Sequence, residues 1–263
     1  MKLISFNVGI KIDNAKDVGE FIKSQNPDIV AFQEIIRHFD DSVFGMYKSQ
    51  KHIKEILDKN LVYSFFGPHW ITDAMRKDGV MHRDFNGFVE QGNELISRYP
   101  ILNATNEHYH KKYSLELEWA NFYTEDHPRC VQIVELDVNG KHLQILNLHG
   151  LYSRDKKDSE RTINQCKYIL EAAKRKLIPT IIVGDFNLLP ETKSIAILNK
   201  EFRNLVKEYK ILSTRPSFDD GTDKDKCVID YIFVNDQIKV NNFEVFNTNI
   251  SDHLPLILDF DIK

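Results

Sequence analysis

The chain has 263 residues, of which 42% are apolar and 28% charged, and its formal net charge is −4. This composition is that of a globular protein with a large packed core, and it excludes a disordered or fibrous chain. The negative balance argues against a broad basic surface for duplex nucleic acid, although bound metal would offset some of the acids. Nucleic acid is therefore a less favoured partner, but not an excluded one.

The first half of the chain alternates strand-like and helix-like apolar patterns. We predict, in order, a strand at 2–8, a helix at 13–24, a strand at 28–35, a helix at 47–60, and strands at 61–66 and 94–97. Between the last two strands, residues 67–92 show no clear periodicity. A connection of this length is usually functional or disordered.

The second half is richer in strands. Asn139-Gly140 is a strong hairpin signal between the alternating runs Arg129–Val138 and Lys141–His149. Further on we predict a helix at 159–176, a strand at 179–185, one or two helices at 192–209, and strands at 228–234, 238–246 and 254–261. About ten to twelve strands with few helices predict an α/β (α+β) protein, a four-layer sandwich of two packed mixed β-sheets flanked by helices.

No repeat or linker-like break divides the sequence, so we predict one domain over residues 1–263 and a monomer. Three widely spaced cysteines without a CxxC pair favour a reducing compartment over a disulfide framework or a zinc knuckle. No signal peptide and no apolar run of membrane-spanning length is found. We expect a cytoplasmic protein without a membrane partner.

Polar side chains stand in or just after strand-like runs at six places. They are Asn7, Glu34 in Phe32-Gln33-Glu34, His149 in Asn147-Leu148-His149, Asp185 and Asn187 in Gly184-Asp185-Phe186-Asn187, Asp230, and the pair Asp252-His253. Buried polar groups are costly unless they are paired or bind a metal. Six such places predict that the strand ends converge on one metal-assisted site.

Each motif alone has a plainer interpretation. Gly184–Asn187 could be a simple turn, Glu34 an ordinary strand-end carboxylate, and Asn7 a loop cap. Asp230 is harder to dismiss, because a charge inside an apolar strand needs a partner. We expect that partner to be His253.

Taken in order, these motifs resemble the endonuclease/exonuclease/phosphatase superfamily of metal-dependent phosphohydrolases over essentially the whole chain. The resemblance includes the run from Gly92 to Pro100, the end motif Ser251-Asp252-His253-Leu254-Pro255, and Arg161 and Gln165 in a helix after the histidine. It implies a two-sheet sandwich with its site at one edge.

The resemblance also implies a metal site. Glu34 is similar to the family's main Mg²⁺ ligand, and Asn7 and Asp252 are expected close to it. Hard oxygen ligands suit Mg²⁺, with Mn²⁺ as a substitute.

The resemblance assigns catalytic roles to five further residues. Asp185 would orient and deprotonate the attacking water, and Asn187 would hold Asp185 or a phosphate oxygen. His253, ionised by Asp230, and His149 would bind the non-bridging phosphate oxygens.

Three positions bear on the branch of the superfamily. The abasic-site endonucleases commonly have an acid where this chain has Gly9, and tend to have tyrosine where it has His149. Both differences favour the deoxyribonuclease-like, sphingomyelinase-like, deadenylase-like and tyrosyl-DNA phosphodiesterase-like branches. Gly150 stands where leucine is usual, which leaves the local substrate wall undefined.

Substrate contacts are expected from the long connection. Its cations Arg76, Lys77 and Arg83 could meet phosphates, and Trp70 could meet a base or an apolar leaving group, with Arg129 beside them. The aromatic rings could equally anchor the connection to the sheet.

Other polar residues receive plainer interpretations. We expect surface or loop positions for His52, His69, His108, His110 and His127. The charge run at 154–157, just after His149, could touch a phosphate tail, but we favour a solvated loop.

The leading hypothesis is a Mg²⁺-dependent phosphodiesterase, a nuclease or tyrosyl-DNA phosphodiesterase-like enzyme, whose partner is a phosphodiester substrate such as DNA or RNA. The alternative is a phosphatase or a sphingomyelinase-like lipid phosphodiesterase on the same scaffold. A catalytically silent binding module is least favoured, because all eight candidate metal and catalytic residues are present.

Overall fold

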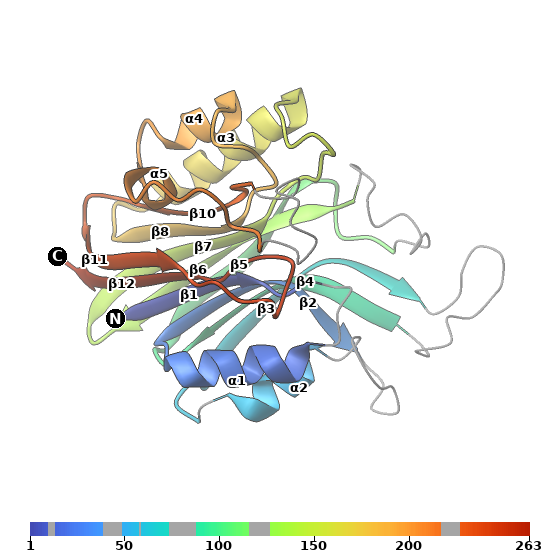
Figure 1. Ribbon diagram of the computed structural model, residues 1–263, viewed down its shortest axis with the longest axis vertical. Helices are drawn as coiled ribbons and strands as arrows, with labels where there is room; N and C mark the ends of the chain where they lie inside the picture. The colour runs from blue at the N-terminus through green and yellow to red at the C-terminus, as the bar shows by residue number, and fades with distance from the viewer. Residues whose placement is uncertain (10–13, 39–48, 58, 74–87, 116–126, 217–226) are drawn as a thin grey trace.

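Two β-sheets pack face to face, with helices on the two outer sides (Figure 1). The computed structural model describes residues 1–9, 14–38, 49–57, 59–73, 88–115, 127–216 and 227–263. In Figure 1, α1 and α2 lie on one side of the sandwich and α3 and α4 on the other. This is the two-sheet sandwich flanked by helices that the sequence predicts.

The first sheet has six strands in the order β11-β12-β1-β2-β4-β3. Its strands are β1 (Lys2–Asn7), β2 (Ile29–His38), β3 (Tyr63–Asp73), β4 (Phe88–Ser97), β11 (Ile238–Val245) and β12 (Leu256–Ile262). β1 and β2 are parallel, whereas the other neighbours are antiparallel. Strands from both ends of the sequence therefore share one sheet.

The second sheet also has six strands, in the order β5-β6-β7-β8-β10-β9. Its strands are β5 (Ile101–His110), β6 (Arg129–Val138), β7 (Lys141–His149), β8 (Thr180–Asp185), β9 (Arg203–Asn204) and β10 (Asp230–Val234). β7 and β8 are parallel and the other pairs antiparallel. β8 and β10 are buried along their whole length, as expected for strands covered on both faces.

The helices cover the outer faces of the sheets. They are α1 (Ala15–Gln25), α2 (Ser49–Ile56), α3 (Glu160–Lys174), α4 (Lys193–Leu198) and α5 (Leu205–Glu208). α1 buries Val18 and Ile22 on one face and ends at Asn26, which adopts the left-handed conformation. α3 begins with a capping box in which the Ser159 side chain accepts from the Thr162 amide.

A buried polar bridge joins the two sheets. Asn147 on β7 accepts from Gln33 Nε2 at 2.8 Å and donates to the backbone oxygen of Phe32 at 3.1 Å, both on β2. Its Nδ2 also donates to Gln132 Oε1 on β6 at 2.8 Å. The three amide side chains are fully buried, so each hydrogen bond replaces one with water. The bridge lies directly below the strand ends that carry Glu34 and His149.

Two strand predictions were wrong in extent. β3 continues to Asp73 and β4 begins at Phe88, so both reach into the stretch expected to be a loop. β5 was missed altogether, because it lies at the edge of its sheet and only a few of its residues are apolar. An edge strand with little buried surface has no alternating apolar pattern to detect.

The expectation that five of the histidines lie at the surface or in loops was also wrong in part. His69 is fully buried in β3, where its Nε2 lies 3.0 Å from Asn93 Oδ1. His127 is buried as well, stacked on Trp70, and His108 and His110 lie in β5. The extension of β3 along the edge of the first sheet accounts for the burial of His69, whose Nδ1 lies 3.4 Å from Cys130 Sγ of the second sheet.

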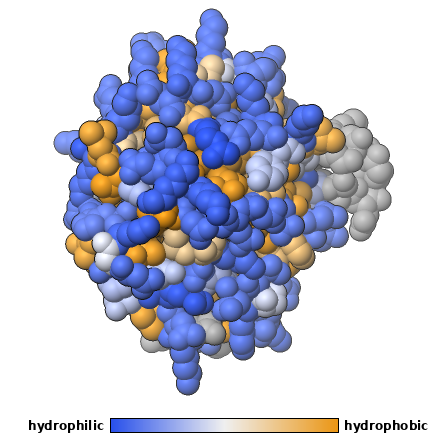
Figure 2. Space-filling view, turned by 90° about the vertical axis from the view of Figure 1, so that its left-hand side faces the viewer, coloured by the Kyte–Doolittle hydropathy of each residue, from blue (hydrophilic) through white to orange (hydrophobic). Residues whose placement is uncertain are grey.

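The surface at the end of the sandwich that carries both chain ends is mainly hydrophilic, with apolar residues in small separate groups (Figure 2). Among the described helices, none has the length and apolar character needed to cross a membrane.

Candidate active site

Parallel strand pairs bring the candidate residues to one edge of the sandwich. At the carboxyl end of the first pair, Asn7 on β1 lies beside Gln33 on β2. In the second sheet, Asp185 on β8 has His149 of β7 on one side and Asp230 of β10 on the other. The site therefore draws residues from both sheets.

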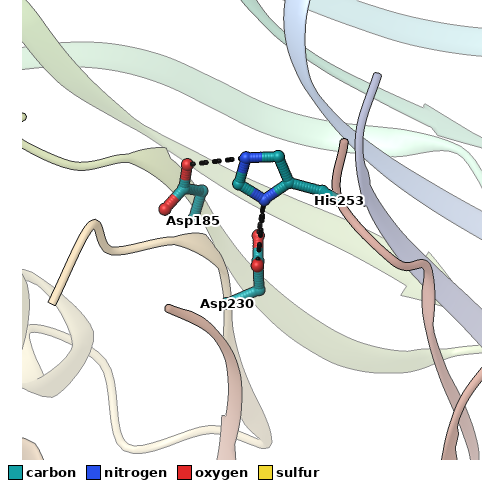
Figure 3. A group of neighbouring side chains, drawn as sticks. All are labelled: Asp185, Asp230 and His253. Carbon is teal, nitrogen blue, oxygen red and sulfur yellow. Dashed lines mark hydrogen bonds and ion pairs between the residues drawn. The ribbon is translucent and has the colours of Figure 1, made fainter. Parts of the chain in front are cut away.

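His253 forms a buried pair with Asp230 (Figure 3). Its Nδ1 lies 3.0 Å from both carboxylate oxygens, and Thr214 Oγ1 donates to Asp230 Oδ2 at 2.6 Å. Burial opposes protonation of His253, but the charges of Asp230 and Asp185 outweigh it and raise its pKa to about 9. His253 is therefore an imidazolium at neutral pH.

Asp185 lies on the other side of the His253 ring, with its Oδ2 at 3.7 Å from Nε2 (Figure 3). The carboxylate accepts from the Asn187 amide at 2.7 Å, from Asn187 Nδ2 at 3.3 Å and from Asn7 Nδ2 at 3.1 Å. Burial, followed by the charge of Asp230, raises the pKa of Asp185 to about 6. A carboxylate in this range can take a proton at neutral pH.

Glu34 reaches the site through an irregularity in β2. The register between β2 and β4 shifts between Phe32 and Ile35, and Glu34 has a φ of 60°, a left-handed conformation unusual for glutamate. Its Oε1 lies 3.4 Å from Asn7 Nδ2, the same amide nitrogen that donates to Asp185. The bulge thus places a second carboxylate near the first.

Asn7 contacts both carboxylates through its amide nitrogen, and its role as a metal ligand stays a prediction. Its Nδ2 donates to both carboxylates, whereas its Oδ1 accepts from the Gly9 amide at 3.1 Å. In this arrangement Asn7 holds Glu34 and Asp185 in position and turns its donor side toward them.

His149 is a neutral donor in this site. Its Nε2 lies 3.6 Å from Asp185 Oδ2 and 3.8 Å from Glu34 Oε1. Burial, followed by the charge of Arg129, holds the pKa of His149 well below its usual range. A neutral imidazole retains one N–H, which can donate to a phosphate oxygen.

Asp252 and Arg215 form an ion pair at the edge of the site, with Nη2 3.0 Å from Oδ2. Burial opposes ionisation of Asp252, but the charges of His253 and Arg215 outweigh it and lower its pKa. Asp252 is therefore an anion at neutral pH.

Two glycines explain departures from the family pattern. A Cβ on Gly9, whose φ is +70°, would lie 2.9 Å from Asp252 Oδ1, so an acid at this position would displace Asp252. A Cβ on Gly150 would lie 2.3 Å from the backbone oxygen of Phe186. Leucine at position 150 would not fit against the turn that carries Asp185.

We expect Gly150→Ala to lower the free energy of unfolding by about 1–3 kcal/mol, the usual cost of overpacking a filled site. Urea unfolding of wild type and variant checks this, and the loss reports the added Cβ alone, because Gly150 is not among the glycines with a positive φ. Equal stability of wild type and Gly150→Ala would show that the backbone moves aside at little cost.

The carboxylates at this edge are oxygen donors of the kind that a hard divalent cation prefers. Glu34 and Asp252 present carboxylate oxygens whose side chains are 17% and 40% exposed, and Asp185 adds a third carboxylate beside Glu34. The lowered pKa of Asp252 keeps it ionised, and oxygen donors of this kind are preferred by Mg²⁺ and Mn²⁺. Among the described residues, the group of three whose ligand atoms lie within 4.8 Å of one another is Asp185, Asp230 and His253, and the Nδ1 of His253 already faces Asp230.

Glu34→Gln should raise the Mg²⁺ concentration needed for half-maximal activity and should be partly rescued by excess metal. Removing one carboxylate weakens a hard-cation site while leaving the fold intact. Calorimetric titration of Mg²⁺ measures the same loss without substrate, and Glu191→Gln is a matched exposed control. Full activity in EDTA would contradict a metal role for Glu34.

Trp70 and Arg129, two of the residues expected to contact the substrate, are buried. Trp70 is 2% exposed and stacks on His127 with ring centroids 5.5 Å apart, which fits the alternative that it anchors the strand. Arg129 is also buried, and its Nε donates to the Gly150 oxygen at 2.9 Å behind the site. Arg76, Lys77 and Arg83 lie outside the described residues, so their role stays a prediction.

Three residues of the site were missed by the sequence interpretation. Thr214 and Arg215 come from a connection without a recognisable motif, and Lys156 belongs to the charge run at 154–157 that was expected to be solvated. The ammonium of Lys156 instead contacts Asn187 Oδ1. The sequence feature that could have pointed to Lys156 is its positive charge close to His149 of the phosphohydrolase motif.

A buried carboxylate with a raised pKa, an imidazolium and further carboxylates at the edge of a two-sheet sandwich are typical of a phosphoester hydrolase. The model of the endonuclease/exonuclease/phosphatase family matches residues 4–253. The chain therefore belongs to this family, whose members generally depend on a divalent metal.

Solved structures share the fold at low sequence identity. An endonuclease/exonuclease/phosphatase from Beutenbergia cavernae is 16% identical, with a TM-score of 0.74, covering 100% of this chain and 71% of that one. A mannosyl-6-phosphatase from Bacteroides thetaiotaomicron is 16% identical, with a TM-score of 0.69 and full coverage of both chains. A humanized D. rerio TDP2 is 16% identical, with a TM-score of 0.68, covering 99% of this chain and 98% of that one. A search of curated proteins found no match.

Proposed function

We propose that this protein is a Mg²⁺-dependent phosphodiesterase acting on nucleic acid or nucleotide-like substrates. The observation that carries the proposal is the position of Asp185, which Asn7 and Asn187 hold by hydrogen bonds. Its carboxylate lies between the protonated imidazole of His253 and the neutral imidazole of His149. A single carboxylate with a raised pKa suits a general base, and the imidazoles on either side suit an anionic substrate.

The residues act in sequence on a phosphoryl group. Asp185 aligns a water for in-line attack on phosphorus and takes its proton. His253, kept protonated by Asp230, donates from Nε2 to a non-bridging oxygen as negative charge develops there. Neutral His149 donates to a second oxygen. A divalent cation held by Glu34 and Asp252 would neutralise charge on the phosphate and on the leaving oxygen.

The nucleotide-like substrate class is supported by the candidate cations Arg76, Lys77 and Arg83 and by the shared fold with TDP2. A panel of abasic, nicked, single-stranded and 5′-blocked oligonucleotides, nucleotides and a small generic diester, assayed with Mg²⁺ and Mn²⁺, tests it. If only the small diester were hydrolysed, the proposed phosphodiesterase chemistry would be supported, but nucleic acid would be excluded as the substrate.

Neutralising Arg76, Lys77 and Arg83 together should raise the KM for oligonucleotides and flatten its dependence on salt, because fewer counterions are then released. Hydrolysis of the small diester should be nearly unchanged. An equal loss on both substrates would indicate a structural role for this stretch.

A second candidate is a phosphatase, which is supported by the shared fold with a mannosyl-6-phosphatase. Adding a sugar monophosphate to the panel separates the two, since a phosphatase would prefer it to every diester.

A further inference from the structure

Two basic side chains that the chemistry above does not use lie beside Asp185 and His253. Lys156 contacts Asn187, which is itself hydrogen-bonded to Asp185. Arg215 contacts His253 and Asp252. The two cations thus flank the catalytic base through its immediate neighbours.

Lys156 is turned inward by its own backbone. Its φ of 57° is left-handed, and its Nζ lies 4.1 Å from the centre of the Tyr152 ring while it donates to Asn187 Oδ1. The neighbours Asp155 and Lys157 are exposed. Within the described ranges no carboxylate lies at ion-pair distance from Lys156, so its charge is met only by a neutral amide and a ring.

Burial lowers the pKa of Lys156, and the charge of Arg215 lowers it further against the opposing charge of Asp185. Lys156 and Arg215 thus flank Asp185, the first through Asn187 and the second through His253. Arg215 is already paired with Asp252, so the charge of Lys156 is the one left for a bound anion to meet.

Arg215 also has unused hydrogen-bonding capacity. Its Nη2 donates to Asp252, its Nη1 lies 3.3 Å from His253 Nε2, and its Nε is buried without a hydrogen-bond partner in the described part of the chain. A guanidinium has only donors, so it cannot accept a hydrogen from His253. The guanidinium of Arg215 and the imidazolium of His253 therefore both direct N–H donors toward the same region.

We propose that Lys156 and Arg215 together bind the non-bridging oxygens of the substrate phosphoryl group. Phosphate supplies several acceptor oxygens at once, and a guanidinium matches it through two parallel hydrogen bonds. This inference rests on the proposed function, because it places the phosphorus beside Asp185.

Calorimetric titration of the full chain with inorganic phosphate, with and without Mg²⁺, measures this binding directly. Lys156→Gln and Arg215→Gln remove each charge and leave a shorter, neutral polar side chain. Each should weaken phosphate binding about tenfold or more, the scale of a hydrogen bond to a charged group. Lys157→Gln, one residue along and exposed, should leave phosphate affinity unchanged, and thermal unfolding confirms that each variant is folded.

A purely structural Arg215 would behave differently. If it only holds Asp252, Arg215→Gln should change the affinity for Mg²⁺ and leave phosphate affinity as in the wild type, and this result would overturn the proposal. Arg215→Lys, which keeps the charge, should restore part of the phosphate binding.

Failure of this proposal is distinguishable from failure of the proposed function. A wild-type enzyme that hydrolyses diesters while Lys156→Gln and Arg215→Gln bind phosphate normally would refute the cation pair alone. If the protein lacked hydrolase activity but its phosphate binding depended on both cations, the proposed activity would be refuted. The phosphate-binding role of Lys156 and Arg215 would stand.

Discussion

Asp185→Asn is expected to lower kcat by about 10²-fold or more, the usual scale for losing a general base. Asparagine can still accept a hydrogen bond from Asn7, but it cannot take a proton from water. Because the folded state raises the pKa of Asp185 to about 6, its ionisation above that pH costs stability. The neutral amide avoids this cost, so the melting temperature should not fall.

Steady-state kinetics and thermal unfolding of the same preparation check both parts of this expectation. Asp236→Asn, an exposed acid just beyond β10, serves as the matched control. An active Asp185→Asn enzyme would show that Gly184–Asn187 is only a turn.

The second large effect is the coupling between Asp230 and His253. Asp230→Asn removes the charge that keeps His253 protonated, and His253→Ala removes the imidazolium itself. Since both changes remove one function, the double variant should be little worse than the more damaged single variant. A loss equal to the product of the two single losses would refute the coupling.

The pH profile separates this coupling from a loss of packing. Activity of the wild type should rise near pH 6 as Asp185 loses its proton and fall near pH 9 as His253 loses its own. In Asp230→Asn, loss of the neighbouring charge should lower the pKa of His253 and move the alkaline limb toward neutral pH. An unmoved alkaline limb with lower activity would indicate that Asp230 only supports the strand.

The sequence predicts the architecture well where a periodic pattern reports burial. β8 and β10 are recognisable because both faces are covered, and β6 and β7 because the Asn139-Gly140 turn fixes their register. β5 has no such pattern at its polar edge position.

The residues of the site divide in the same way, into those that a sequence motif indicates and those that no motif indicates. Asp185 and Glu34 are found from strand-end motifs, and their proximity is a consequence of the sheet. Arg215 could not be found, since it meets Asp252 only through packing of a connection 37 residues away in sequence. Lys156 was hidden by its exposed neighbours, because a charge run does not reveal which member turns inward.

The bridge of Gln33, Asn147 and Gln132 bears on which core changes the enzyme can tolerate. Apolar contacts are non-directional and allow the sheets to slide, whereas hydrogen bonds fix the offset between them. Glu34 lies on one sheet and Asp185 on the other, so that offset sets their separation. Conservative apolar changes elsewhere between the sheets can therefore accumulate over evolution with little effect on turnover. The amide at position 147 lacks this freedom, since moving it displaces one half of the reaction machinery from the other.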